Sequence, residues 1–285
     1  MRNYVSLIMD IEKSRRYSVE DRTELQKFIS YSVDGLNELF KENIEYDVTF
    51  SAGDELQGLF NDVTVAVMYF RLFEMLVKPV KLRAGIGVGE WTIRIENGLS
   101  TQQDGPAYHR ARYAIDEVRK KSFQNIRIIS DWDDVMANHL INASGVLKDQ
   151  QIYMQNASSV ILELLCPFVK EDMNIDIYGI VRELLEKKFE YKIGQPFRVG
   201  PRRDAPEKSV SLQFPFISLL EPIYINGDIV EAEDQIMIKN VSSVISDILG
   251  CSRQNVDSIL RRGNANKIRE LDYMALQYIE RVYRE

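Results

Sequence analysis

The stretch YDVTFSAGDELQGLF, residues 46–60, alternates apolar and polar positions on both sides of a Gly-Asp pair. Such alternation predicts two half-buried β-strands, and the glycine supplies the backbone freedom that a tight turn needs. The stretch therefore predicts a β-hairpin whose turn lies near Gly53 and carries Asp54. The position of this hairpin along the chain decides how the neighbouring segments pair.

The segments around the hairpin alternate between strand and helix patterns. Residues 4–11 form an apolar run that predicts a strand, and residues 18–40 repeat apolar side chains at helical spacing. After the hairpin, residues 61–78 predict a second helix. Residues 80–95 predict a strand with three glycines on one side, where another group can approach closely. The order strand, helix, strand, strand, helix, strand is that of the ferredoxin-like unit.

We therefore predict an α/β (α+β) protein with a ferredoxin-like palm domain in residues 1–130. The composition then turns helical, and prolines separate short strand-like pieces after about residue 171. Residues 131–238 are accordingly predicted as a helical segment with a Pro-rich, β-containing insertion. Residues 239–285 are predicted as a helix-turn-helix domain.

The composition excludes several classes of protein. Lys and Arg total 36 against 43 Asp and Glu, and a net charge of -7 argues against binding nucleic acid or an anionic membrane over the whole surface. Cys166 and Cys251 lie too far apart in sequence for a disulfide framework or a zinc cluster. Because the apolar runs are short or interrupted, we expect no signal peptide and no membrane span. A cytoplasmic protein with plain core cysteines is the expectation.

The first predicted strand carries a carboxylate, that of Asp10, near its end. In a ferredoxin-like unit the first and third strands pair antiparallel, so Asp10 is expected beside the hairpin turn and next to Asp54. Two carboxylates are hard oxygen ligands suited to Mg²⁺ or Mn²⁺ on a triphosphate, and Gly53 lets the backbone approach such a ligand. The alternative is that Asp10 ends the strand and Asp54 is only a turn residue.

These residues resemble the palm-type catalytic domain shared by class III nucleotidyl cyclases and GGDEF diguanylate cyclases. Asp10-Ile11 is similar to the Asp-Ile end of a cyclase strand, and Gly53-Asp54 is similar to the cyclase hairpin. The hairpin, read on to Glu55, is also similar to the Gly-Gly-Asp-Glu-Phe turn of diguanylate cyclases. The resemblance implies a metal at Asp10 and Asp54, a nucleotide near Ile11, Gly53 and Glu55, and a site shared by a homodimer.

The next helix departs from the cyclase pattern. Class III cyclases carry there an Asn and an Arg that stabilise the transition state, but His109 and Tyr113 stand at these positions. The helix begins after a Gly-Pro pair, and its free N–H groups, with His109 and with Arg110 or Arg112, are suited to face a phosphate. The alternative is that His109 is an ordinary solvated residue. IMDIEKSR, AGDELQGLF, DGPAYHRAR and the C-terminal module together most closely resemble the SatD family.

The C-terminal module reads SSVISDILGCSRQNVDSILRRG, residues 242–263. Gly250 lies at the expected turn, and Ser252 is a predicted N-cap of the second helix. Bases outnumber acids in and after that helix, and its predicted exposed residues are of types that hydrogen-bond phosphates and base edges. These predicted DNA-binding residues are Ser252, Arg253, Gln254, Asn255, Arg261 and Arg262. The alternative is a helical hairpin used only for packing or dimerisation.

Three functions are compatible with these features. The first is a nucleotide-responsive, DNA-binding regulatory protein with a divalent-metal and nucleotide site in the palm-like domain. The second is an active metal-dependent nucleotidyl cyclase or nucleotidyltransferase, in which two Mg²⁺ ions activate the attacking hydroxyl. The third is a structural adaptor with a vestigial acidic pair. The first uses every feature found, and we favour it.

Overall fold

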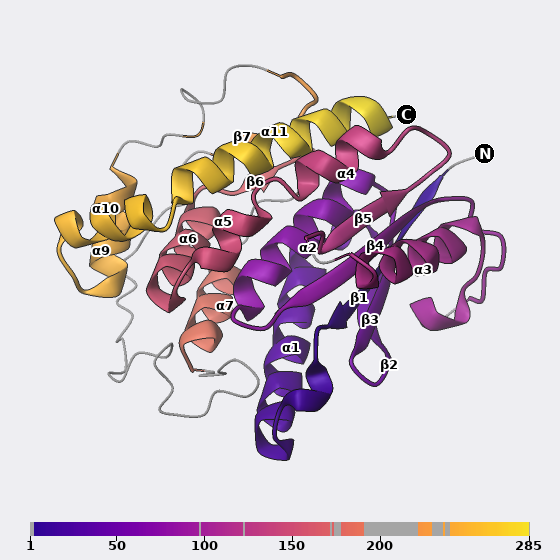
Figure 1. Cartoon of the computed structure of the whole chain (residues 1–285), viewed down its shortest axis with the longest axis horizontal. Helices are drawn as coiled ribbons and strands as arrows, with labels where there is room; N and C mark the ends of the chain where they lie inside the picture. Colours follow the sequence, from indigo (N-terminus) through magenta and orange to yellow (C-terminus); the bar gives the residue numbers. More distant parts are fainter. Residues whose placement is uncertain are drawn as a thin grey trace.

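The computed structural model describes residues 3–96, 98–121, 123–171, 173, 178–190, 222–229, 236 and 240–284. Its central feature is a five-stranded sheet in the order β2-β3-β1-β4-β5 (Figure 1). The strands are β1 (Tyr4–Ile11), β2 (Ile44–Ala52), β3 (Glu55–Phe60), β4 (Leu82–Gly89) and β5 (Ile126–Ile129). The β2-β3, β3-β1 and β1-β4 pairs are antiparallel, and β5 joins β4 in parallel. The predicted mixed α/β fold and its strand order are confirmed.

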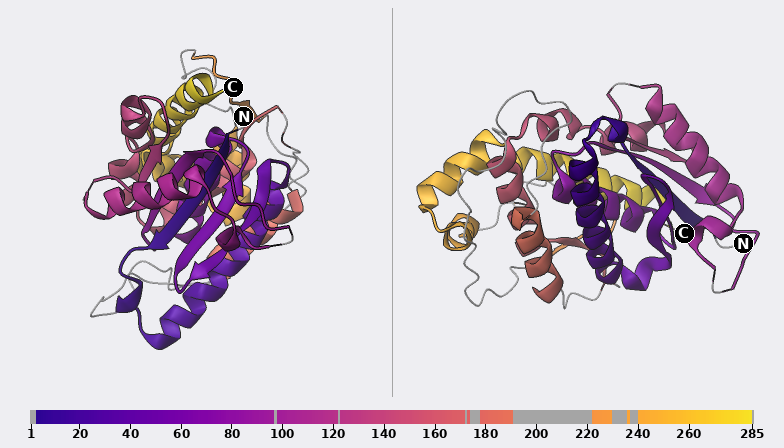
Figure 2. Two further views of the ribbon diagram at one scale, coloured as in Figure 1. Left: turned by 90° about the vertical axis from the view of Figure 1, so that its right-hand side faces the viewer. Right: turned by 90° about the horizontal axis from the view of Figure 1, so that it is seen from below.

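Helices cover both faces of the sheet because β1 is apolar on both sides. Leu7 and Met9 belong to the large core that also contains side chains of α1 (Val19–Leu39) and α2 (Val63–Val77). Ile8 points to the other face, where it packs against α3 (Pro106–Arg119). The views in Figures 1 and 2 show these two helical layers on either side of the strands.

The glycines of β4 explain how α3 lies so close to the sheet. A Cβ atom on Gly87 would overlap the carbonyl oxygen of Ala107, and a Cβ atom on Gly85 would overlap that of Ala111. The close approach predicted for this strand is therefore made by the backbone of α3. The strand is also shorter than the predicted span of residues 80–95, because the chain leaves the sheet after Gly89 and folds back on itself.

The second half of the chain is mainly helical. Its elements are α4 (Val135–Ile141), α5 (Gly145–Gln150), α6 (Tyr153–Leu165), β6 (Phe168–Val169), α7 (Tyr178–Glu190), β7 (Ile223–Tyr224), α9 (Val241–Leu249), α10 (Arg253–Arg262) and α11 (Ala265–Tyr283). Short 3₁₀ helices occur at Ser14–Arg16, Lys41–Asn43 and Ser100–Gln102. Most of the Pro-rich insertion predicted for residues 171–238 lies outside the described residues.

Helix α11 connects the sheet-containing half of the protein to α9 and α10, which lie away from the sheet in Figures 1 and 2. It packs against α2 and α4, and its apolar side chains belong to the same large core as β1.

The predicted domain boundaries at residues 130 and 238 stay predictions. Among the described residues, no helix combines the length and apolar character needed to cross a bilayer.

Buried ion pairs also tie α11 to α2 and α6. Arg71 on α2 donates two hydrogen bonds to Glu163 on α6, at 2.6 and 2.7 Å, and one to Asp272 on α11, at 2.5 Å. Arg269 on α11 also pairs with Glu163. These four side chains are only 2–8% exposed. We call them the closed cluster.

Candidate functional site

The end of β1 brings Asp10 to the hairpin, as the sequence predicts. In the strand register Asp10 lies opposite Glu55 on β3 and opposite Arg83 on β4. Asp54 directly precedes Glu55 in the turn that joins β2 to β3. Gly53 has a φ of 66°, a left-handed conformation that glycine adopts without strain, and this conformation forms the turn. A metal shared by Asp10 and Asp54 stays a prediction.

Two arginines of α3 bind the carboxylates at this end of the sheet. Arg119 donates to Oδ2 of Asp10 from Nε and Nη2, at 2.9 and 2.7 Å. Arg112 donates to both carboxylate oxygens of Glu55, at 2.5 and 2.7 Å. Arg119 also approaches Glu55 at 3.7 Å. Asp10, Glu55, Arg112 and Arg119 therefore form one connected set, which we call the open cluster.

Sequence reasoning named three members of the open cluster but missed Arg119. The seven-residue spacing from Arg112 to Arg119 corresponds to two helical turns and places both arginines on one face of α3. That spacing is the signal that was available in the sequence. What the sequence could not show is that the glycines of β4 draw this face onto the end of β1.

The carboxylates of the open cluster are shielded, but the guanidinium groups are accessible. The side chains of Asp10 and Glu55 are 13% and 14% exposed, whereas those of Arg112 and Arg119 are 45% and 37% exposed. Burial would raise the pKa of Glu55, but the hydrogen bonds from Arg112 and from the hydroxyl of Ser51 outweigh it and lower this pKa. Burial would lower the pKa of Arg119, but the pairing with Asp10 outweighs burial and raises this pKa. The pair of Glu55 and Arg112 is therefore ionised at neutral pH.

One oxygen of Asp10 has no hydrogen-bond partner. Oδ1 is buried, while Oδ2 accepts both hydrogen bonds from Arg119. A buried, unpaired carboxylate oxygen is costly unless it gains a partner, and a hard cation is a suitable one. The described residues contain no group of three or more His, Cys, Asp or Glu arranged to hold a metal. Asp10 and Asp54 could therefore supply only part of a coordination shell, and phosphate oxygens and water would complete a Mg²⁺ site of the usual kind.

The other predicted nucleotide contacts lie in different settings. Ile11 is buried at the end of β1, next to Asp10. His109 lies one turn before Arg112 on α3, but its Nε2 contacts Oδ1 of Asp104 at 2.8 Å rather than a residue of the open cluster. Tyr113 is 58% exposed. Arg112 and Glu55 are thus brought to Asp10, and His109 has another partner.

Comparisons with known proteins place the chain in a family. A model of the SatD family matches residues 4–175, which include the whole sheet, α3 and the open cluster. The chain belongs to the SatD family. No curated protein matches the chain. A link to GGDEF diguanylate cyclases stays a prediction.

Two solved structures of a bacterial light-regulated adenylyl cyclase are weakly similar to this SatD protein. The sequence identities are 11% and 12%, and both TM-scores are 0.34. Each match covers 44% of this chain, and the matches cover 74% and 42% of the cyclase chains. These values do not transfer the cyclase activity to the SatD chain.

The predicted C-terminal helix pair consists of α9 and α10. Gly250 ends α9 with a φ of 62°, and the hydroxyl of Ser252 accepts a hydrogen bond from the backbone N–H of Asn255 at the start of α10. Val256 and Leu260 bury the inner face of α10. Each predicted DNA-binding side chain is exposed: Ser252, Arg253, Gln254, Asn255, Arg261 and Arg262. DNA binding by this surface stays a prediction.

Proposed function

We propose that this SatD protein is a regulatory protein that binds a nucleotide with a divalent cation at the open cluster and contacts DNA through α10. The buried, unpaired Oδ1 of Asp10 is the observation that supports the proposal most strongly. It is a carboxylate oxygen that the described part of the chain leaves without a partner, beside arginines that are accessible to solvent. Nucleotide phosphates are recognised by this combination of groups.

The residues of the cluster have separate roles in this proposal. Asp10 and Asp54 would hold Mg²⁺ or Mn²⁺, and the bound ion would offset the charge of the carboxylates and of the phosphates. Arg112 and Arg119, relieved of their carboxylate partners, are long enough and exposed enough to bind phosphate oxygens. The backbone at Ile11 and Gly53 is close to the same place. This exchange of partners would couple nucleotide binding to the position of α3.

An active nucleotidyl cyclase or nucleotidyltransferase is the alternative. Against it, His109 and Tyr113 replace the Asn and Arg of class III cyclases. His109 is also paired with Asp104. A panel of nucleoside triphosphates with Mg²⁺ or Mn²⁺, measured for both binding and product, separates the two functions. Cation-dependent binding without product supports the regulatory protein, whereas rapid formation of a cyclic or linear phosphodiester shows the enzyme.

Asp54→Asn tests whether the acidic pair holds the cation. The substitution keeps the size of the side chain but removes its charge, so Mg²⁺-dependent nucleotide binding should weaken by about tenfold or more, measured by calorimetry. Asp47→Asn is the matched control, because Asp47 is an exposed aspartate of the neighbouring strand β2. Unchanged nucleotide binding by Asp54→Asn would exclude a metal site that uses this residue.

Arg261→Ala/Arg262→Ala tests the proposed contact with DNA. Both arginines are exposed in the last turn of α10. If they contact phosphates, the double variant should bind all DNA sequences more weakly, and the slope of log affinity against log salt should fall by roughly two. Arg22→Ala/Lys41→Ala, two exposed bases of the palm-like half, is the control. Equal DNA binding by both double variants would leave α10 with a packing role, and a sedimentation measurement would then test the homodimer that the resemblance implies.

A further inference from the structure

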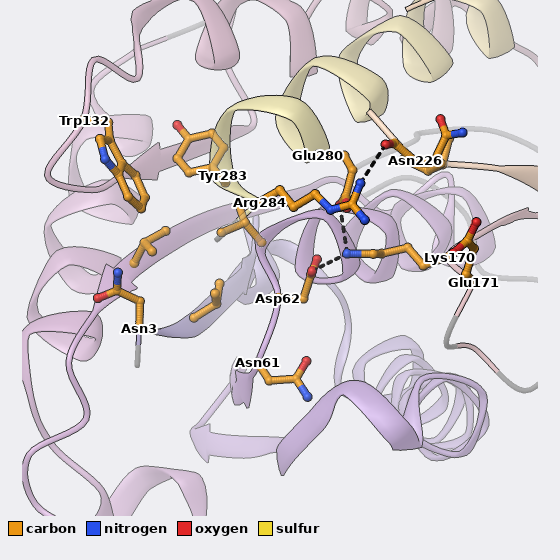
Figure 3. A pocket seen from close by; sticks show the side chains of 14 residues that line it. Asn3, Asn61, Asp62, Trp132, Lys170, Glu171, Asn226, Glu280, Tyr283 and Arg284 are labelled. Carbon is orange, nitrogen blue, oxygen red and sulfur yellow. Dashed lines mark hydrogen bonds and ion pairs between the residues drawn. The ribbon is translucent and has the colours of Figure 1, made fainter. Parts of the chain in front are cut away.

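A polar cavity opens at the other end of β1, away from the open cluster. It has a volume of about 380 Å³, within the range of sites for small molecules. Val5 lines it, and Asp10 lies five positions further along the strand, a distance of about 17 Å. Figure 3 shows that side chains from both ends of the sequence meet here, including Asn3 and Arg284.

The charges in this cavity are already matched to one another. Lys170 lies between the carboxylates of Asp62 and Glu280 and pairs with both (Figure 3). Burial opposes ionisation of Lys170, but these two acids outweigh burial and raise its pKa. Arg284 donates to the backbone oxygen of Asn226 at 3.2 Å and lies 3.9 Å from Glu280.

The balance of charge disfavours an anionic ligand. With Glu171, the lining contains three carboxylates against two cations, Lys170 and Arg284. An incoming phosphate would meet an excess of negative charge, and the charge of Lys170 is already shared between two carboxylates. A ligand without net charge fits this lining better.

An aromatic wall favours a flat ligand. Trp132 and Tyr283 line the cavity, with their ring centroids 5.4 Å apart and their planes at 77°. The Tyr283 hydroxyl donates to Asp134 at 2.5 Å, which fixes that ring. In an edge-to-face pair at least one face of the indole is left uncovered, and Trp132 is 43% exposed. A planar heterocycle could stack on that face.

Amide side chains supply the matching polar edge. Asn3 and Asn61 line the cavity, below Trp132 in the view of Figure 3, together with the buried side chains of Val5 and Val88. The amide nitrogen of Asn61 also donates to the backbone oxygen of Glu42 at 3.4 Å. An amide presents a donor and an acceptor side by side, which is how asparagine pairs with the N6 and N7 edge of adenine. We propose that this cavity binds an uncharged purine, as the free base or the nucleoside, stacked on Trp132 and read by Asn61.

The fluorescence of Trp132 provides the test. The chain has two tryptophans, so Trp91→Phe leaves Trp132 as the only one. Titration of this variant with adenosine, guanosine and adenine should give saturable quenching below about 1 mM for at least one of them. Asn61→Ala in the same background should weaken that affinity about tenfold, and AMP should bind more weakly than adenosine. Asp10→Asn should leave purine binding unchanged, which separates this cavity from the open cluster.

Each opposite result overturns the proposal. Absence of saturable quenching by every purine in the folded Trp91→Phe protein would show that no purine stacks on Trp132. Tighter binding of AMP than of adenosine would show that the ligand is anionic. Undiminished purine affinity in Asn61→Ala would show that Asn61 does not recognise the purine. Tighter binding of indole or free tryptophan than of any purine would assign the cavity to another aromatic class. The melting temperature of the protein that carries both Trp91→Phe and Asn61→Ala, compared with that of Trp91→Phe alone, shows whether the second substitution disturbs folding.

Discussion

The closed and open clusters use the same residue types but differ in their access to water. Both contain two acids and two arginines joined by short hydrogen bonds. Each also has a further ionic partner, Lys148 on Asp272 in the closed cluster and Asp116 on Arg119 in the open cluster. In the closed cluster every side chain is 2–8% exposed, whereas the arginines of the open cluster are 37% and 45% exposed. Residue types and pair geometry are therefore alike in the two clusters, and the exposure of the arginines to solvent is what differs.

The physical reason is the cost of leaving a charge without its partner. In the interior, an ion that loses its partner has neither water nor another group to replace it, so the closed cluster must stay intact. At the surface, water or a ligand can take the place of either partner at a cost of about 1 kcal/mol or less. Of the two clusters, only the open one has arginines accessible enough for water or a ligand to replace an internal pair.

The largest expected effect is on the closed cluster. Glu163→Gln keeps the shape of the side chain but leaves Arg71 and Arg269 without their shared carboxylate. We expect a loss of about 3–5 kcal/mol of unfolding free energy, measured in urea. The matched control is Glu55→Gln, which removes a carboxylate that is bound by both terminal nitrogens of Arg112 in the open cluster. Its loss should be about 1 kcal/mol or less. Equal losses would remove the distinction between the clusters.

The sequence predicts the features of the fold that depend on interactions between residues close together in the chain. The ferredoxin-like order was predictable because hydrophobic periodicity and turn chemistry are local, as at the Gly53 turn and in the helix after Ser18. That order predicted Asp10 beside the hairpin turn and next to Asp54, and the register places it opposite Glu55, the residue that follows Asp54. One local expectation was wrong: the strand of β4 ends at Gly89, because the next residues pair with the segment around Asp104 instead of the sheet.

The remaining features depend on contacts between distant parts of the chain. Arg119 reaches Asp10 across 109 positions, and Arg71 reaches Asp272 across 201. The cavity on Trp132 combines residues from Asn3 to Arg284. No spacing in the sequence encodes such meetings, because they arise only after α3 and α11 have packed on the sheet. Sequence patterns predicted the elements and the approach of Asp10 to the hairpin, but not the pairing of Arg112 with Glu55 and of Arg119 with Asp10.

A buried lysine that has no carboxylate partner among the described residues provides an intermediate test. Lys188 is 2% exposed and donates to the carbonyl oxygens of Met75 and Leu76 at the end of α2, at 3.2 and 2.8 Å. Burial, assisted by the nearby charge of Lys78, lowers the pKa of Lys188 to about 7. In the unfolded chain a lysine titrates near 10.4. Between these two values the unfolded chain binds more protons than the folded chain, so stability should rise with pH.

The comparison of Lys188→Met with the unmodified protein isolates this effect. From pH 7 to pH 9 the unmodified protein should gain roughly 2–3 kcal/mol of unfolding free energy relative to the variant, and below pH 7 the difference should be constant. Lys187→Met is the control, because Lys187 is more exposed and pairs with Glu190. Parallel pH profiles for the protein and Lys188→Met would show that the buried amine stays charged in the folded state.

The smallest expected change in stability belongs to Arg119→Ala, and it gives the sharpest test of the open cluster. Because Arg119 is 37% exposed, its loss should cost about 1 kcal/mol or less in urea unfolding. Asp10 then has no arginine partner, so Mg²⁺ alone should raise the melting temperature more than it does for the unmodified protein. Nucleotide binding should weaken, because a phosphate contact is lost. Lys120→Ala, an exposed neighbour paired with Glu117, should change neither response. A loss of 3 kcal/mol or more, roughly that of a buried pair, would make Arg119 a structural residue and the two clusters equivalent.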